Sequence, residues 1–348
     1  MSMHIWLVDR DGRRVTDRLD TPIGSVGSQG RVFRLRGRPD TVVKVLHRVD
    51  RAELATRIRA LLAEPTDWTG QAGHPVVAWP YAAVRRRDDD RLVGYAAPWL
   101  GPPLFAPLPL LFNPVARAQM LPGITWVWWL TVAEELARVV EAVHQRGHVV
   151  GDLAPVNVFV TATGGVCLID VDGWQLHDPT TGVDLPCPFS RPEYTAPEVL
   201  GPAPGRRDHS SDAWALAVLV AQLVCLGFHP YGGVPPDATG PVEEVDNVHL
   251  RRCRLLGADL RAPAAAVPAD LLPDVLRRRL SEALDAGFDA PAARPGPRSW
   301  AAALAYARDR LVGCPIAPTH VYPRERRHCP WCAMVAAGAP DPFPGGRR

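Results

Sequence analysis

The sequence has 348 residues, 47% of them hydrophobic and 22% charged, a composition that excludes a disordered or fibrous protein. The net charge of +2 at pH 7 excludes a strongly basic protein built to bind nucleic acid or an anionic membrane. The N-terminus lacks the apolar stretch of a signal peptide, and no run of about 18 apolar residues predicts a membrane span. Seven cysteines, an odd number, do not suggest a disulfide framework, so we expect a reduced, cytoplasmic protein.

Short apolar runs separated by Gly and Pro predict strands within residues 1–50, and 41–46 is the clearest of them. Helical spacing of apolar residues predicts a helix over 50–63, and 76–84 and 92–97 are expected to form two more strands. The proline-rich segment 101–114 is expected to be irregular and to link two lobes.

Longer apolar segments predict that the rest of the chain is mainly helical. A helix is expected over 126–146, where Gly147 ends it. The elements expected after it are short strands near 149–150, 158–160 and 166–169, and helices over 213–226, 270–287 and 298–312. Strands first and helices later predict an α+β fold.

The sequence contains a single lysine, Lys44, against 38 arginines. The abundance of arginine, alanine and proline is typical of GC-rich codon usage, under which arginine replaces lysine wherever only positive charge matters. The lysine that remains indicates a position that needs a compact ammonium group, with chance as the alternative.

Five motifs occur in a fixed order along the chain. A glycine-rich segment, 24–30, precedes Lys44, and Asp152 and Asn157 lie five residues apart in Gly-Asp-Leu-Ala-Pro-Val-Asn. Asp170 follows in Leu-Ile-Asp, and then come Ala-Pro-Glu at 196–198 and Ser-Asp-Ala-Trp at 211–214. This order resembles the eukaryotic-like serine/threonine protein kinases over about residues 20–311. The resemblance implies a two-lobed protein-kinase-like fold with an N-lobe over 1–100 and a C-lobe over 101–311.

The chemistry of phosphoryl transfer assigns roles to these residues, with ATP and Mg²⁺ (or Mn²⁺) as cofactors. Lys44 would bind the α- and β-phosphates, and Asn157 and Asp170 would hold the metal through oxygen. Asp152 would orient the attacking hydroxyl and accept its proton. The expected nucleotide-binding positions are Gly24, Gly27, Gly30, Val32, Lys44 and Glu53.

Several supporting positions are also assigned. Glu53, on the predicted helix 50–63, is favoured over Glu64 as the carboxylate that holds Lys44. Asp172 is either a second metal ligand or an ordinary turn residue. Structural roles are expected for Asp212, which would brace the catalytic loop, for a Glu198–Arg294 pair and for His144.

The sequence also departs from the kinase pattern. Gly151 stands where the family has an arginine before the catalytic aspartate, and Ala154 where it has a lysine. Asp-Val-Asp replaces Asp-Phe-Gly at 170–172. These departures resemble the bacterial tellurite-resistance-associated kinases, which implies a stress-linked phosphorylation switch with a von Willebrand factor A protein and a metal-dependent phosphatase as partners. The alternatives are a pseudokinase scaffold and a small-molecule kinase of the aminoglycoside type.

A zinc knuckle is predicted over 312–334 at the end of the chain, followed by a flexible tail over 335–348. Two thiolates two residues apart suit one tetrahedral Zn²⁺, although such a pair could also be redox-active. An upstream Cys and His favour a closed, structural zinc site, and His328 is the rival nitrogen ligand. The expected ligands are Cys314, His320, Cys329 and Cys332.

Overall fold

The structure is a computed structural model, which describes residues 3–24, 30–47, 51–64, 67–178, 180–200 and 207–344. Gly27, predicted to lie in the phosphate-binding loop, falls outside these residues. The chain divides into two compact units, Met1–Leu104 with Cys167–Pro188, and Phe105–Val166 with Phe189–Arg348. The division therefore differs from the predicted boundary at residue 100. Residues 167–188 belong to the first unit because Leu168 pairs with the backbone near Val77.

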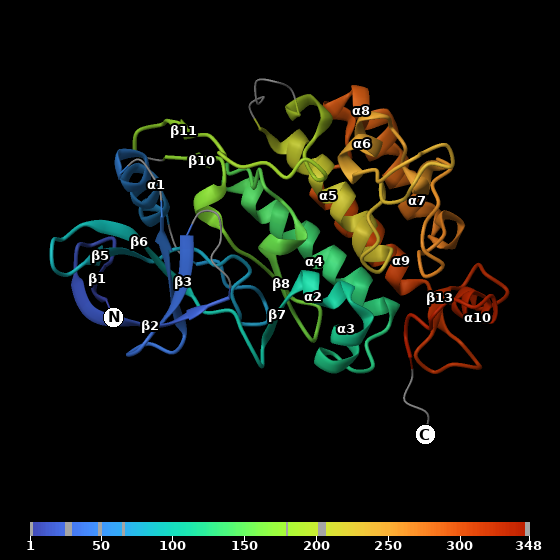
Figure 1. Cartoon of the computed structure of the whole chain (residues 1–348), viewed down its shortest axis with the longest axis horizontal. Coiled ribbons are helices and arrows are strands. Elements are labelled where there is room, and N and C mark those ends of the chain that lie inside the picture. The colour runs from blue at the N-terminus through green and yellow to red at the C-terminus, as the bar shows by residue number, and fades with distance from the viewer. Residues whose placement is uncertain are drawn as a thin grey trace. The chain divides into compact units, whose positions relative to one another are not determined.

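Six strands of the first unit form one antiparallel sheet that closes on itself (Figure 1). They are β1 (His4–Val8), β2 (Arg14–Ile23), β3 (Gly30–Leu35), β4 (Thr41–Leu46), β5 (Ala82–Arg86) and β6 (Leu92–Pro98). Their order is β1-β2-β3-β4-β6-β5, and β5 pairs back with β1. Alternate side chains face inward and build a core around Ile5, Val43 and Val84, which are completely buried.

Helix α1 (Arg51–Ala63) lies on this sheet, as the apolar spacing predicts. Its residues Leu54, Ile58 and Leu62 pack against Tyr95 and Ala97 of β6. The predicted strand 76–84 starts later than expected, at Ala82, since the residues before it form only an isolated bridge. Two short strands, β10 (Leu176–His177) and β11 (Asp184–Leu185), pair in the same unit.

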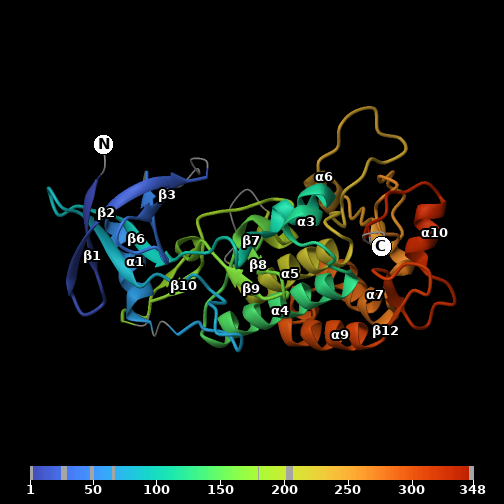
Figure 2. The ribbon, with the colours of Figure 1, turned by 90° about the horizontal axis from the view of Figure 1, so that it is seen from below.

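The second unit is mainly helical, as predicted. Its longest helix, α4 (Trp126–Gln145), packs against α5 (His209–Val224) and α9 (Pro297–Asp309) (Figure 2). The remaining helices are α2 (Leu108–Phe112), α3 (Pro114–Met120), α6 (Glu244–His249), α7 (Asp274–Ser281), α8 (Gly287–Asp289) and α10 (Pro330–Ala336). Its strands are β7 (Phe105–Pro107), β8 (Val158–Thr161), β12 (Leu311–Gly313) and β13 (Val321–Pro323), while β9 (Val166–Leu168) crosses the boundary between the units. None of the helices in the described part of the chain combines the length and apolar character that a bilayer span requires.

The segment 101–114 is more regular than its prolines predict. It contains β7, α2 and the first residue of α3. Two of its prolines, Pro109 and Pro114, lie in the first turn of α2 and of α3, where the missing N–H needs no partner. The Asn113 side chain then accepts hydrogen bonds from Val115 N and Ala116 N and caps α3.

Over residues 335–344, the part of it that the structure describes, the C-terminal segment packs closely, unlike the flexible tail expected over 335–348. Phe343 is buried, and its ring contacts Trp331 of α10 with centroids 5.2 Å apart. Arg117 of α3 donates a hydrogen bond to the carbonyl of Pro342 over 3.1 Å. The Pro- and Gly-rich composition of this segment predicts no packing, but the apolar side chain of Phe343 is buried and holds the segment in place. Residues 345–348 lie outside the described part of the chain.

Candidate active site and tail metal centre

Strand β4 carries Lys44 at the middle of three paired strands. Val32 of β3 and Tyr95 of β6 lie directly opposite it in register. Residues opposite one another in a sheet point to the same face, so Lys44 and Tyr95 lie side by side. Gly94 allows this close pairing, because a Cβ at that position would lie 1.8 Å from the carbonyl oxygen of Lys44.

Two aspartates surround the ammonium group of Lys44. Lys44 Nζ lies 2.9 and 3.2 Å from the two carboxylate oxygens of Asp172 and also forms an ion pair with Asp170. The Tyr95 hydroxyl donates to Asp172 Oδ1 over 2.5 Å. Burial by itself lowers the pKa of Lys44, but Asp172 and Asp170 outweigh it and raise that pKa, so the lysine stays charged. Burial followed by the charge of Asp172 raises the pKa of Tyr95, which keeps its proton as a donor.

The expectation that Glu53 holds Lys44 is wrong for this structure. Glu53 lies in the first turn of α1, where its side chain is half exposed and accepts a hydrogen bond from Arg57 Nε over 3.2 Å. Arg57 lies one helical turn further along the same face of α1, and the Glu53 carboxylate pairs with it instead of with Lys44. The sequence allows two roles for Asp172, a second metal ligand or an ordinary turn residue. In the structure Asp172 is buried, and its carboxylate contacts Lys44.

Arg57 was not predicted and fixes the segment that carries the two aspartates. Its guanidinium donates to the carbonyls of Asp172, over 3.3 Å, and Trp174, over 3.0 Å, and also to that of Pro186. The side chain is almost fully buried. A signal for it exists in the sequence, since Arg57 follows Leu54 by three residues and so shares the apolar face of α1.

Asp170 adopts a left-handed backbone conformation, with φ of 66°. It precedes the 3-10 turn η2 (Val171–Gly173). The turn places Asp170 and Asp172 on the same ammonium group. Of the other positions predicted to bind nucleotide, Gly24 follows β2, whereas Gly30 and Val32 lie on β3.

In the second unit, Asp212 braces the loop that contains Asp152, as predicted. Its carboxylate accepts hydrogen bonds from Val150 N over 2.7 Å and Gly151 N over 2.8 Å, and lies 2.9 Å from His144 Nε2. Gly151 has a φ of 72°, a conformation that favours glycine. The first turn of α5 therefore holds the loop, and His144 has the structural role expected of it.

The structure brings Asp152 and Asn157 together. Asn157, at the end of the 3-10 turn η1 (Pro155–Asn157), donates from Nδ2 to the Asp152 carbonyl over 2.8 Å and to Asp152 Oδ2 over 3.1 Å. Asp152 is buried, and burial raises its pKa, while the charge of Arg191, 3.4 Å from Oδ2, acts in the opposite direction. The Asn157 amide nitrogen is committed to Asp152, which leaves the carbonyl oxygen as the atom suited to a metal.

The predicted pair of Glu198 and Arg294 is present and bidentate. Arg294 Nη1 and Nη2 lie 2.6 and 2.8 Å from the two carboxylate oxygens of Glu198. Arg294 also donates to the carbonyls of Gly287 over 2.8 Å and Ser210 over 2.9 Å. Because the Arg294 side chain is completely buried, the pair fixes the Ala-Pro-Glu segment to the helices beneath it.

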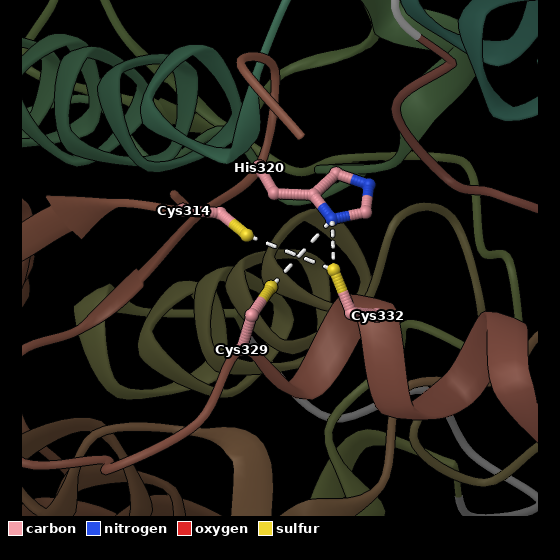
Figure 3. Close-up of side chains that lie close together, drawn as sticks. All are labelled: Cys314, His320, Cys329 and Cys332. Atoms are coloured by element: carbon pink, nitrogen blue, oxygen red, sulfur yellow. Dashed lines mark hydrogen bonds between the residues drawn. The ribbon is translucent and has the colours of Figure 1, made fainter. Parts of the chain in front are cut away.

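The four predicted ligands of the tail converge (Figure 3). Pairing of β12 with β13 sets Cys314 beside His320, whose carbonyl accepts from Cys314 N over 2.8 Å, while Cys329 and Cys332 lie at the start of α10. His320 Nδ1 is 3.5 Å from Cys329 Sγ and 3.4 Å from Cys332 Sγ, and Cys314 Sγ is 3.6 Å from Cys332 Sγ. A tetrahedral Zn²⁺ with bonds of about 2.3 Å to sulfur and 2.0 Å to nitrogen needs S–S separations of about 3.8 Å and S–N separations of about 3.5 Å. The rival His328 is exposed and does not belong to this cluster.

A second layer of contacts, missed in the sequence, orients these four side chains. Asp341 Oδ1 lies 2.9 Å from His320 Nε2, on the side of the ring away from the thiols, and accepts from Phe343 N over 2.8 Å. Cys314 Sγ accepts from the N–H groups of Ile316 and Ala317 over 3.4 and 3.5 Å. Carboxylates that hold the far nitrogen of a histidine are typical of metal centres.

Comparison with known proteins gives matches to protein kinases, although no protein family model matches the sequence. Protein kinase YegI of Escherichia coli O157:H7 and of strain K12 is 30% identical over 321 residues, which cover 90% of this chain and 48% of each relative. The chain thus spans about half the length of these curated relatives. Among solved structures, a rhoptry kinase from Toxoplasma gondii superimposes with a TM-score of 0.59 at 15% identity, covering 89% of this chain and 84% of that one. At that identity the match concerns the fold alone.

Proposed function

We propose that this chain, a protein-kinase-like protein with the protein kinase fold, transfers the γ-phosphate of ATP to serine or threonine hydroxyls of a protein substrate. The observation that carries the proposal is the paired geometry of Asp152 and Asn157 in a loop that Asp212 braces. A loop held in this way positions a base and a metal ligand before substrate binds, and phosphoryl transfer depends mainly on positioning.

Each residue has a defined task in the reaction. Lys44, oriented by Asp172, would bind the α- and β-phosphates, and Asn157 and Asp170 would hold Mg²⁺. The metal would neutralise charge on the phosphates. Asp152 would accept the proton of the hydroxyl as its oxygen bonds to the γ-phosphorus, and ADP would leave with the electrons of the broken P–O bond.

The direct test is transfer from labelled ATP in the presence of Mg²⁺, with the chain itself and a mixture of Ser-, Thr- and Tyr-containing peptides as acceptors. We expect label on serine and threonine, and none in Asp152→Asn, which keeps the shape of the side chain without its charge. Nucleotide binding without transfer would favour the pseudokinase scaffold, for which Ala154 and Gly151 argue. Transfer to an aminoglycoside and not to peptides would favour a small-molecule kinase.

We further propose that the chain acts in a stress-linked switch with a von Willebrand factor A protein and a metal-dependent phosphatase. The motifs shared with tellurite-resistance-associated kinases support this assignment. Purified candidates of both kinds, mixed with the chain and with its Asp152→Asn variant, would test it. Phosphate should appear on the first protein only with the parent, and the second protein should remove it.

The tail is proposed to hold one structural Zn²⁺ through Cys314, His320, Cys329 and Cys332. The distances between these atoms fit a tetrahedral ion, and Asp341 supplies the orienting carboxylate. Four protein ligands close the site, so the ion would stabilise the tail rather than take part in phosphoryl transfer. The site adjoins an aromatic contact, since Trp331 of α10 packs on Trp126 of α4 with centroids 5.3 Å apart.

Elemental analysis tests the zinc proposal. We expect about one zinc per chain, a sharp fall in Cys329→Ser, and no change in Cys187→Ser, whose thiol lies outside the cluster. Metal-free protein with a disulfide between Cys329 and Cys332 after reducing purification would support the redox alternative.

A further inference from the structure

The loop that carries Asp152 contains no positive charge. Residues 149–157 include neither lysine nor arginine. Under the proposed function, Asp152 accepts a proton beside a phosphoryl group that carries negative charge. Two neighbouring anions repel each other, and phosphoryl transfer is stabilised by cations held at the reacting group. A protein cation beside Asp152, in addition to the Lys44 and Mg²⁺ proposed for the phosphates, would therefore come from another segment of the chain.

The positive charges of Arg191 and Arg207 both act on Asp152, and Arg191 forms an ion pair with it. Arg191 Nε lies 3.4 Å from Asp152 Oδ2, in the same unit of the chain. This nitrogen is buried and has no other hydrogen-bond partner, so Asp152 is the group that it contacts. The side chain as a whole keeps 39% of its surface exposed, against 7% for Asp152. The guanidinium can thus contact the carboxylate and still offer N–H donors to a bound group.

The two contacts on Asp152 also distinguish its oxygens. Asn157 Nδ2, at 3.1 Å, and Arg191 Nε, at 3.4 Å, both approach Oδ2. These contacts leave Oδ1 as the oxygen that would accept the proton of the substrate hydroxyl. Arg191 therefore neutralises Asp152 without occupying the atom that the reaction needs.

The backbone of Arg191 is held firmly. Its carbonyl accepts hydrogen bonds from Tyr194 N over 2.9 Å, from Thr195 N over 3.0 Å and from Thr195 Oγ1 over 2.8 Å. Three residues after this turn, Glu198 is paired with the buried Arg294. The cation is thus carried on a short turn anchored to the helices, which is what a preorganised group requires.

We propose that Arg191 is a catalytic cation of this protein, which neutralises Asp152 and donates N–H groups to the phosphoryl group during transfer. The inference rests on the proposed kinase function. It assigns to residues 189–195 the positive charge that the loop 149–157 lacks. A guanidinium suits this task, since its fork of donors matches two phosphate oxygens.

The experiment compares turnover and ATP affinity in four purified proteins: the parent, Arg191→Met, Arg191→Lys and the control Arg298→Met. Arg298 is an exposed arginine that pairs with Glu141 on the surface of the same unit. For Arg191→Met we expect kcat to fall about 100-fold, the usual effect of removing one charged donor from a transition state. The KM for ATP should stay within about threefold, because the interaction forms mainly during transfer. The kcat of Arg191→Lys should be about tenfold higher than that of Arg191→Met, and the kcat of Arg298→Met should equal that of the parent.

The outcomes separate this inference from the function on which it rests. If the parent transfers phosphate and Asp152→Asn does not, the kinase function stands, and Arg191→Met alone decides the inference. Unchanged turnover in Arg191→Met would overturn it, as would increased turnover, which would show that Arg191 restrains Asp152. An equal loss in Arg191→Lys and Arg191→Met would also overturn it, because charge would then not be the active property. A parent that transfers no phosphate to any acceptor would overturn both proposals.

Discussion

Replacing Asp172 by asparagine should loosen Lys44 without changing the shape of its surroundings. The Asp172 carboxylate accepts hydrogen bonds from Lys44 Nζ over 2.9 Å and from the Tyr95 hydroxyl over 2.5 Å. At an effective dielectric constant of about 20, two unit charges at this separation attract by about 6 kcal/mol, which is an upper bound. Asp170 remains beside the ammonium group in the variant. The net loss should therefore be closer to that of one charged hydrogen bond, about 2 kcal/mol.

The matched control is Glu53→Gln, since Glu53 is the residue that the sequence favours as the partner of Lys44. The Glu53 side chain is 52% exposed and pairs with Arg57. The free energy of unfolding of Glu53→Gln should therefore differ from that of the parent by less than about 0.5 kcal/mol. Urea unfolding measures the stability of both variants, and titration with a fluorescent ATP analogue measures binding. Asp172→Asn should weaken nucleotide binding about tenfold, equivalent to 1.4 kcal/mol, while Glu53→Gln should leave it unchanged. Equal losses in the two variants, or a larger loss in Glu53→Gln, would refute the assignment of Asp172 as the partner of Lys44.

Four further predictions concern other parts of the chain. Lys44→Arg should abolish most transfer and leave the fold intact by circular dichroism, because a guanidinium is wider than an ammonium group; autophosphorylation equal to that of the parent would contradict it. Basal activity should survive phosphatase treatment of the segment between Asp172 and Glu198, since Gly151 offers no arginine to a phosphate there; lost activity that returns on rephosphorylation would disprove this. Glu198→Ala should cost about 3–5 kcal/mol in chemical unfolding, because Arg294 would keep an unpaired buried charge, whereas Glu141→Ala on the exposed Arg298 pair should cost less than about 1 kcal/mol. Asp341→Asn should weaken zinc binding about 10–100-fold in a chelator competition, with the exposed Asp309→Asn as the unaffected control.

The main elements could be predicted from the sequence because local signals specify them. Apolar periodicity located α1, α4, α5 and α9 within a few residues. The bracing contact of Asp212 and the pair of Glu198 and Arg294 followed from motif order, since the family places these residues at fixed points of the fold. The spacing of cysteine and histidine likewise located the tail cluster.

The partners of these residues were harder to predict, because they depend on tertiary packing between distant segments. Glu53 has the helix position expected for the partner of Lys44, but a nearer arginine on the same helix takes it. Asp172 contacts Lys44 in a segment that Arg57 of α1 holds, and Tyr95 of β6, which lies opposite Lys44, also donates to it. Asp341 lies in a Pro- and Gly-rich stretch with no periodicity, and only the fold of the tail shows that it faces His320.

The solitary Lys44 gives the protein a single internal site for a lysine-specific protease. That site lies in the middle of β4, where the side chain is only 12% exposed, so the native chain should resist cleavage until the sheet opens. Each cleavage event therefore reports the opening of one strand. The cleavage rate, followed as the appearance of fragments 1–44 and 45–348, would measure how nucleotide and metal change the local stability of the first unit.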